Sequence, residues 1–237
     1  MIDSPGAWHE FANREKFNEA LVQRLAGTLQ SASLSQGHVL LGLSGGTTPM
    51  PVYQALSQKE LAWNRIKLVL VDERWVANNH ADSNERNIRE AFAGNALAEK
   101  NIIGLWSEKA DLESAAIAAD QKLAAINEVM DVVLLGMGED GHFASLFPSG
   151  TEFDHAISTT GSRFVFPISP MPDHATHPRL SMSLAYIQRA KRIILAITGE
   201  KKRLILKQAI TEGNSHRLPI AALFTANSPA VEVYWSK

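Results

Sequence analysis

Short apolar runs alternate along this chain with segments whose apolar residues recur at helical spacing. The runs cover residues 39–43, 66–71, 132–135, 164–168, 192–198 and 220–224. A strand that is buried on both faces of a sheet reads as such a continuous apolar run. This alternation therefore limits the possible folds more than any other feature of the sequence.

The segments between the runs predict helices. Phe17, Leu21, Leu25 and Leu29 recur every four residues and predict an N-terminal amphipathic helix that ends before Gly37. Further helices are expected through Tyr53 and Leu56, over residues 84–92, along a stripe over residues 112–126, and over residues 200–210. Strands that alternate with helices favour an α/β fold of three Rossmann-like layers, in which a mostly parallel sheet carries helices on both faces.

Length and composition narrow the class of protein. The 237 residues fit one large α/β domain, and we expect residues 1–237 to form it because no segment looks like a linker or a repeat. The net charge of −2 does not favour nucleic acid or an acidic membrane as a partner. The absence of cysteine excludes disulfides, thiolate nucleophiles and cysteine-based zinc sites.

Neither a targeting segment nor a membrane span is visible. The first ten residues lack a basic start followed by an apolar run, and no segment approaches the roughly 20 apolar residues that a bilayer requires. We therefore expect a cytoplasmic protein that has no contact with membranes.

The loop after the first predicted strand has the composition of a phosphate site. Gly45 and Gly46 allow the backbone to approach an anion, and Ser44, Thr47 and Thr48 add hydroxyl donors. The helix that follows would point free N–H groups at the anion, with a threonine as its N-cap and a proline at its first position. From the residues alone, a phosphate cradle and a plain capped Gly–Gly turn remain equally favoured.

The same loop also matches G-x-S-x-G, with Ser44 at the position of a hydrolase nucleophile. In the nucleophile elbow the helix begins at the serine, whereas Pro49 here places the helix start several residues later. We therefore disfavour a nucleophilic role for Ser44.

A second candidate loop follows the run at residues 66–71. Asp72, Glu73 and Arg74 place carboxylates and a guanidinium at the expected end of a strand, where ligands bind in open α/β sheets. Arg74 could pair with a carboxylate or phosphate, or stabilise an oxyanion. The alternative is a structural ion pair, and an isolated D-E-R motif favours that alternative.

A third candidate loop covers residues 136–148, GMGEDGHFASLFP. Its G-x-G-x-x-G match does not predict a dinucleotide site, because Pro148 interrupts the long helix that such a site needs. The loop presents Asp140 and His142 instead. A histidine is the commonest general base near neutral pH, and a carboxylate two residues away could orient it. A structural histidine is the alternative, but a glycine-rich loop at a strand end favours function.

Two further cations and one loop stand out. These cations are Arg179 and Lys202. Lys202 follows a predicted strand and lies at the start of a predicted helix, from which it could reach an anion. An exposed lysine is the more common explanation for Lys202 alone. Residues 169–178 hold three prolines and predict a loop, which could be a lid or a simple connection.

Taken together, these segments resemble the 6-phosphogluconolactonase family, within a larger group that also holds the glucosamine-6-phosphate deaminases. The resemblance covers nearly the whole chain. It is carried by LSGGTTP (43–49), VDERWV (71–76), DSNERN (82–87), GMGEDGHFASLFP (136–148), PRLSMS (178–183) and TGEKK (198–202). Each motif is weak alone, but their order and spacing are specific.

The resemblance favours the lactonases over the deaminases. Deaminases typically carry D-E-Y where this chain has D-E-R, and I-A-F-N-E-P after the G-H pair, which supplies a glutamate to the histidine. Here residues 143–148 contain no acid. The lactonase pattern G-H-T-A-S-L-F-P fits, except that Phe143 replaces the threonine. The later R-I-T-L-T reads R-L-S-M-S, which keeps Arg179.

The resemblance implies hydrolysis of 6-phospho-D-glucono-1,5-lactone to 6-phosphogluconate, a step of the oxidative pentose phosphate pathway. It implies that His142 activates water, that Asp140 or Asp72 supports it, and that Arg74 stabilises the oxyanion or holds substrate. It assigns the phosphate to a set formed by Ser44, Gly45, Gly46, Thr47, Arg179 and Lys202.

We expect no metal, no cofactor, no macromolecular partner and a monomer. A sugar-phosphate deaminase or isomerase is the alternative enzyme, and a non-catalytic sugar-phosphate sensor is the alternative from another class.

Overall fold

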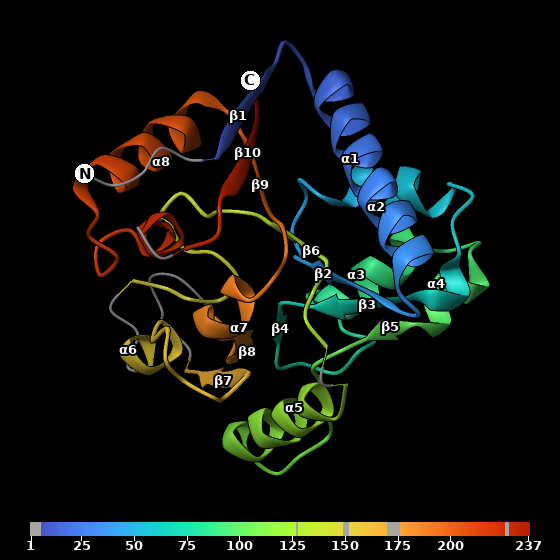
Figure 1. The fold of residues 1–237 in the computed structure, drawn as a ribbon. Helices are drawn as coiled ribbons and strands as arrows, with labels where there is room; N and C mark the ends of the chain where they lie inside the picture. The colour runs from blue at the N-terminus through green and yellow to red at the C-terminus, as the bar shows by residue number, and fades with distance from the viewer. Residues whose placement is uncertain (1–5, 127, 149–151, 170–175, 226–227) are drawn as a thin grey trace.

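A seven-stranded parallel sheet forms the centre of the protein (Figure 1). The computed structural model describes residues 6–126, 128–148, 152–169, 176–225 and 228–237. The strand order is β1-β10-β9-β6-β2-β3-β5, and every neighbouring pair is parallel. These strands are β1 Ala7–Phe11, β2 Val39–Leu43, β3 Ile66–Leu70, β5 Ile102–Ile103, β6 Val132–Leu135, β9 Ile193–Thr198 and β10 Val231–Ser236.

Helices cover both faces of this sheet, which confirms the predicted fold class. Figure 1 shows α1 and α2 on one side of the sheet and α8 on the other. Contacts join α1 to β1, β2 and β10, α2 to α1, and α8 to β9. The helices are α1 Arg14–Ser35, α2 Met50–Ser57, α3 Asn84–Ala91, α4 Ala96–Lys100, α5 Leu112–Ile126, α6 Phe153–Ala156, α7 Leu184–Gln188 and α8 Glu200–Glu212, with short 3-10 turns η1 Trp63–Arg65 and η2 Pro219–Phe224.

A second, three-stranded antiparallel sheet was not predicted. It pairs β4 (Asp72–Arg74), β8 (Arg179–Met182) and β7 (Val165–Ile168) in the order β4-β8-β7. The D-E-R segment is therefore a strand and not a loop, and the apolar run at residues 164–168 belongs to this small sheet. Backbone hydrogen bonds from Val71 N to Leu43 O and from Met182 N to Val71 O join the two sheets.

Other details also differ from the sequence-based expectations. The run at residues 220–224 forms η2 and not a strand, while β1 and β10 were not anticipated. Helix α2 begins at Met50, Pro49 takes the N-cap position, and no side chain caps the helix. The predicted threonine cap is thus wrong. Pro51 has no N–H group, and the N–H groups of Met50 and Val52 in the first turn of α2 receive no capping side chain.

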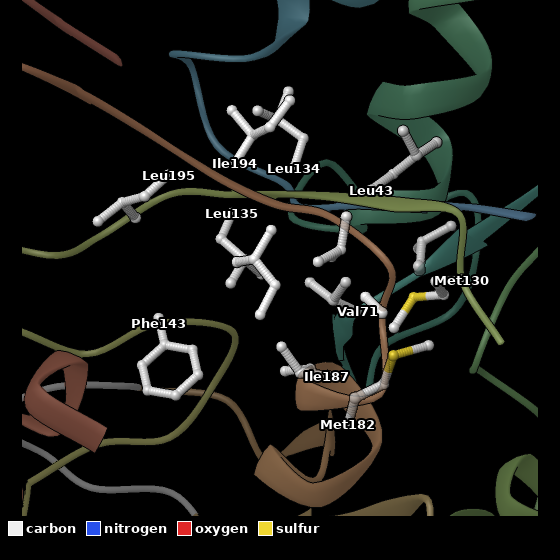
Figure 2. Packing of buried hydrophobic residues seen from close by; sticks show 14 of the residues in the cluster. Leu43, Val71, Met130, Leu134, Leu135, Phe143, Met182, Ile187, Ile194 and Leu195 are labelled. Carbon is white, nitrogen blue, oxygen red and sulfur yellow. The ribbon is translucent and has the colours of Figure 1, made fainter. Parts of the chain in front are cut away.

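The core extends from the main sheet to the small sheet. Figure 2 shows Leu135 and Leu195 of the main sheet in one apolar cluster with Met182 of β8, Ile187 of α7 and Phe143. Phe143 is fully buried. Because it directly follows the predicted catalytic histidine, its burial anchors that loop to the core. In the described part of the chain, no helix is both long and apolar enough to cross a membrane.

Candidate active site

One cavity of about 270 Å³ gathers nearly all of the predicted site residues. It opens where β2 and β6 end, between the small sheet and the start of α8. The predicted residues that line it are Ser44, Gly45, Gly46, Thr47, Asp72, Arg74, His142, Arg179 and Lys202. Asp140 does not line the cavity but contacts His142 from behind. The segments after β2, β6 and β9 converge because parallel strands end at the same edge of a sheet, and the small antiparallel sheet brings Asp72, Arg74 and Arg179 to that edge.

The glycine loop, which we define as residues 44–47, carries unsatisfied donors. Within the described residues, the N–H groups of Gly45, Gly46 and Thr47 make no backbone hydrogen bond. Ser44 is buried, and its Oγ has no partner among the described residues. Gly46 has a φ of 91°, a conformation that favours glycine. Free N–H groups and a hydroxyl beside a helix N-terminus form the environment that binds a phosphate.

His142 is fixed by its own loop. Its Nδ1 lies 2.5 Å from Asp140 Oδ1, and its backbone carbonyl accepts a hydrogen bond of 2.8 Å from Gly138 N. A Cβ on Gly138 would lie 2.2 Å from the imidazole Cε1, so only glycine leaves room for this ring. The Phe147 ring packs on the imidazole with centroids 4.5 Å apart. With Nδ1 facing Asp140, Nε2 is the nitrogen left for chemistry.

Asp72 contacts Ser145 and Arg179. Its Oδ2 accepts a hydrogen bond of 2.6 Å from Ser145 Oγ and lies 3.9 Å from Arg179 Nη1. No hydrogen bond joins it to His142 in the described residues. Of the two carboxylates that the sequence left open, Asp140 is therefore the one in contact with the histidine. Asp72 links the segment after His142 to β8.

Glu73 is a structural carboxylate between β4 and α3. It is fully buried, and its two oxygens accept hydrogen bonds from the N–H groups of Arg74, Asn84 and Glu85 and from the Ser83 hydroxyl. Burial raises the pKa of Glu73 to about 7, while the backbone N–H donors act in the opposite direction. The D-E-R motif is thus divided: Glu73 supports the fold, while its two neighbours face the cavity.

Three cations border the cavity. Arg74 donates from Nη1 to Asn84 Oδ1 and to the Asp82 carbonyl, both at 2.9 Å. Burial lowers the pKa of Arg179 and also that of Lys202. The sequence alone favoured an exposed position for Lys202, but in the structure Lys202 is half-buried and lines the cavity. Arg179 has Asp72 3.9 Å away, and a cation that is partly stripped of water in this way is stabilised further by a bound anion.

Two residues of this site were missed by sequence reasoning. Asn84 and Ser145 are both buried, Asn84 lines the cavity, and Ser145 holds Asp72. Both lie inside motifs that carried the resemblance, DSNERN and GMGEDGHFASLFP, but neither is charged and so neither was singled out. Of the predicted loop at residues 169–178, residues 170–175 lie outside the described part, so its possible role as a lid stays a prediction.

The described residues contain no group of three or more His, Asp or Glu side chains arranged to hold a metal ion. The chemical groups available at the cavity are a histidine–aspartate pair, a glycine loop in which the N–H groups of residues 45–47 make no backbone hydrogen bond to the described residues, and three cations. Such a set can activate water and hold a small anionic substrate.

The chain is similar to a known protein family over most of its length. Residues 12–235 match the family described as glucosamine-6-phosphate isomerases/6-phosphogluconolactonase. The chain belongs to this family. The sequence-based recognition is thus confirmed over nearly the whole length.

Individual members of the family are similar over almost their entire length. A 6-phosphogluconolactonase of Pseudomonas aeruginosa is 38% identical over 215 residues, which are 91% of this chain and 88% of the relative. One of Rhizobium meliloti is 34% identical over 228 residues, 96% of this chain and 97% of the relative. The crystal structure of a 6-phosphogluconolactonase from Shewanella baltica OS155 superposes with a TM-score of 0.93 at 32% identity and covers 100% of both chains.

Proposed function

We propose that this protein hydrolyses 6-phospho-D-glucono-1,5-lactone to 6-phosphogluconate, with His142 as the general base. The observation that carries the proposal is the single cavity that holds both His142, backed by Asp140 at 2.5 Å, and the glycine loop with its free N–H groups. A base and an anion cradle in one cavity suit a phosphorylated substrate that is attacked by water.

The base step follows from the orientation of the imidazole. Asp140 accepts a hydrogen bond from the Nδ1–H group and so leaves Nε2 able to take a proton from water. The hydroxide that forms attacks the C1 carbonyl of the lactone. When the C1–ring oxygen bond breaks, the same proton passes from Nε2 to the departing oxygen. Asp140 stabilises the imidazolium between these two events.

The three cations stabilise the developing negative charge and bind the phosphate. Arg74 stabilises the negative charge that develops on the carbonyl oxygen. Arg179 and Lys202 neutralise the phosphate in the glycine loop, where Ser44 Oγ and the N–H groups of residues 45–47 complete its coordination. The reaction uses only base catalysis, charge stabilisation and positioning, so this proposal includes no metal or cofactor.

The segment after His142 supports lactone hydrolysis over deamination. Residues 143–148 carry no carboxylate, and Phe143 is fully buried while Ser145 bonds to Asp72. Opening of an amino sugar by this loop would lack a carboxylate from residues 143–148. The named relatives described above are 6-phosphogluconolactonases, which agrees with this choice.

The decisive experiment is a coupled assay on freshly generated lactone, corrected for its spontaneous hydrolysis. We expect formation of 6-phosphogluconate well above the uncatalysed rate. Ammonia release from glucosamine 6-phosphate, measured in parallel, should stay at background. Ammonia release without lactone turnover would overturn the proposal in favour of a deaminase, and tight binding of 6-phosphogluconate without turnover would favour a sensor.

A further inference from the structure

Asn84, the first residue of α3, lies between the glycine loop and Arg74. Its side chain is 2% exposed. Its Oδ1 accepts a hydrogen bond of 2.9 Å from Arg74 Nη1, and its Nδ2 donates one of 3.0 Å to the Asp72 carbonyl. The amide thus uses both ends to hold β4 and the guanidinium that β4 carries.

The other side of the same amide supports the glycine loop. A Cβ on Gly45 would lie 1.9 Å from Asn84 Oδ1 and 2.3 Å from its Cγ, closer than atoms can approach. The Gly45 backbone therefore rests directly on the amide, and no larger residue fits there without displacing it. One side chain consequently contacts the proposed anion cradle and the proposed oxyanion-stabilising arginine.

Glu73 makes this arrangement rigid. Its Oε1 accepts hydrogen bonds of 2.7 Å from both the Arg74 N–H and the Asn84 N–H. The backbones of these two residues are therefore fixed relative to each other by one buried oxygen. Their side chains meet on the cavity side of that link, where both line the cavity.

We infer that Asn84 is a positioning residue that sets Arg74 at a fixed distance from the glycine loop. The inference rests on the proposed function, because it concerns the separation between the substrate phosphate and the carbonyl oxygen that Arg74 stabilises. The Asn84 amide acts through Arg74 and through Gly45, and it takes no part in proton transfer.

A double-mutant cycle with Arg74 tests the first contact. We expect Asn84→Ala to lower kcat about 10- to 100-fold, because a group displaced by an ångström near the reacting atoms costs about that much. KM should change far less. In the Arg74→Ala background the same substitution should have little further effect on kcat. If the kcat losses of the two single variants multiply in the double variant, the inference is overturned. It is also overturned if Asn84→Ala raises KM and leaves kcat unchanged.

A second cycle tests the contact with Gly45. Gly45→Ala should displace the Asn84 amide and so lower kcat in addition to raising KM. Removing that amide relieves the clash, so the kcat loss caused by Gly45→Ala should be smaller in the Asn84→Ala background. An equal loss in both backgrounds would show that Gly45 and Arg74 are not linked through Asn84.

Asn84→Asp keeps the Oδ1 acceptor for Arg74 and the shape of the side chain, although it loses the Nδ2 donor to the Asp72 carbonyl. It should retain more kcat than Asn84→Ala, and equal loss in the two would contradict the role of the acceptor. Lys16→Ala is the control, since Lys16 lies on α1 in an exposed pair with Glu19 and does not line the cavity. It should leave kcat and KM unchanged. If the wild type does not hydrolyse the lactone, both the proposed function and this inference fail. If the wild type is active but the effects of the substitutions on kcat are independent of one another, only the inference fails.

Discussion

At the scale of single residues, His142 depends on its immediate neighbours. Asp140 holds one ring nitrogen, the Phe147 ring packs on one face, and Gly138 leaves the space that the imidazole occupies. The fully buried Phe143 anchors the following residue. A histidine confined in this way loses little further freedom when a substrate binds, which suits a general base.

Replacing His142 tests its role directly. We expect His142→Ala to lower kcat by about 10²–10⁴, the usual contribution of a general base, with little change in KM. His155→Ala is the control, because His155 is exposed on α6 and does not line the cavity. Steady-state kinetics on fresh lactone would measure both variants. An unchanged kcat in His142→Ala would mean that another group is the base.

Arg179 should act on binding more than on chemistry. Its removal costs the phosphate one charged partner, an effect on the order of 2–5 kcal/mol, so Arg179→Ala is expected to raise KM strongly. Arg163→Ala serves as the control, since Arg163 pairs with Glu113 away from the cavity. A fall in kcat at constant KM would instead place Arg179 at the reacting carbon.

At the scale of elements, the small antiparallel sheet supplies two of the three cations of the site, and α8 supplies Lys202. β4 and β8 pair in a register that places Arg74 opposite Arg179. Like charges on paired strands repel each other, and the cost is relieved by nearby anions. Asp72 lies 3.9 Å from Arg179, and the proposed substrate phosphate would add further negative charge.

Glu73, which joins β4 to α3, predicts a dependence of stability on pH. Burial raises its pKa from the ordinary 4.5 to about 7, so the folded chain keeps a proton that the unfolded chain releases. Between these two values, the contribution of Glu73 to the free energy of unfolding should fall as pH rises. Denaturant unfolding of the wild type and of Glu73→Gln across this range measures it.

The slope with pH, and not the absolute stability, is the quantity to compare for Glu73. Glu73→Gln introduces an NH₂ group where the wild type accepts hydrogen bonds, so the variant should be less stable at every pH. Its stability should nevertheless fall less steeply with pH than that of the wild type. Parallel curves for the two proteins would show that Glu73 does not titrate in this range.

At the scale of the whole molecule, the two ends of the chain complete the main sheet together. β1 pairs with β10, and β10 pairs with β9, which leads into α8 and Lys202. Trp235 Nε1 donates a hydrogen bond of 3.0 Å to the Gly199 carbonyl at the start of α8. The C-terminal strand therefore supports an element that carries part of the proposed phosphate site.

Truncation after Ala230 should abolish cooperative folding. It removes β10 from the interior of the sheet, including the buried Val231, Val233 and Trp235, and leaves β1 without its partner. Burial of one such side chain contributes about 1.5–3 kcal/mol, so the loss approaches the 5–15 kcal/mol of a typical domain. Removal of Lys237 alone is the control. A truncated chain that still unfolds cooperatively, followed by circular dichroism, would contradict this expectation.

The sequence by itself determined four strands of the main sheet and most of the residues that meet at the cavity. Strands buried on both faces leave continuous apolar runs, so β2, β3, β6 and β9 could be predicted closely, and the glycine loop, Asp140, His142, Arg179 and Lys202 were recognised in their motifs. β1 and β10 were missed because polar residues interrupt them. The run at residues 220–224 was misassigned because an apolar run is equally compatible with a buried helical turn.

Only the tertiary structure decided how these residues divide the work. No local pattern distinguishes Asp72 from Asp140 as the partner of His142, and the distances assign Asp140. Nor does any pattern show that Glu73 is structural while Arg74 faces the cavity, because this follows from the antiparallel pairing of β4 with a strand about a hundred residues away. Local spacing determines which residues lie at strand ends, whereas contacts between distant segments determine which atoms meet.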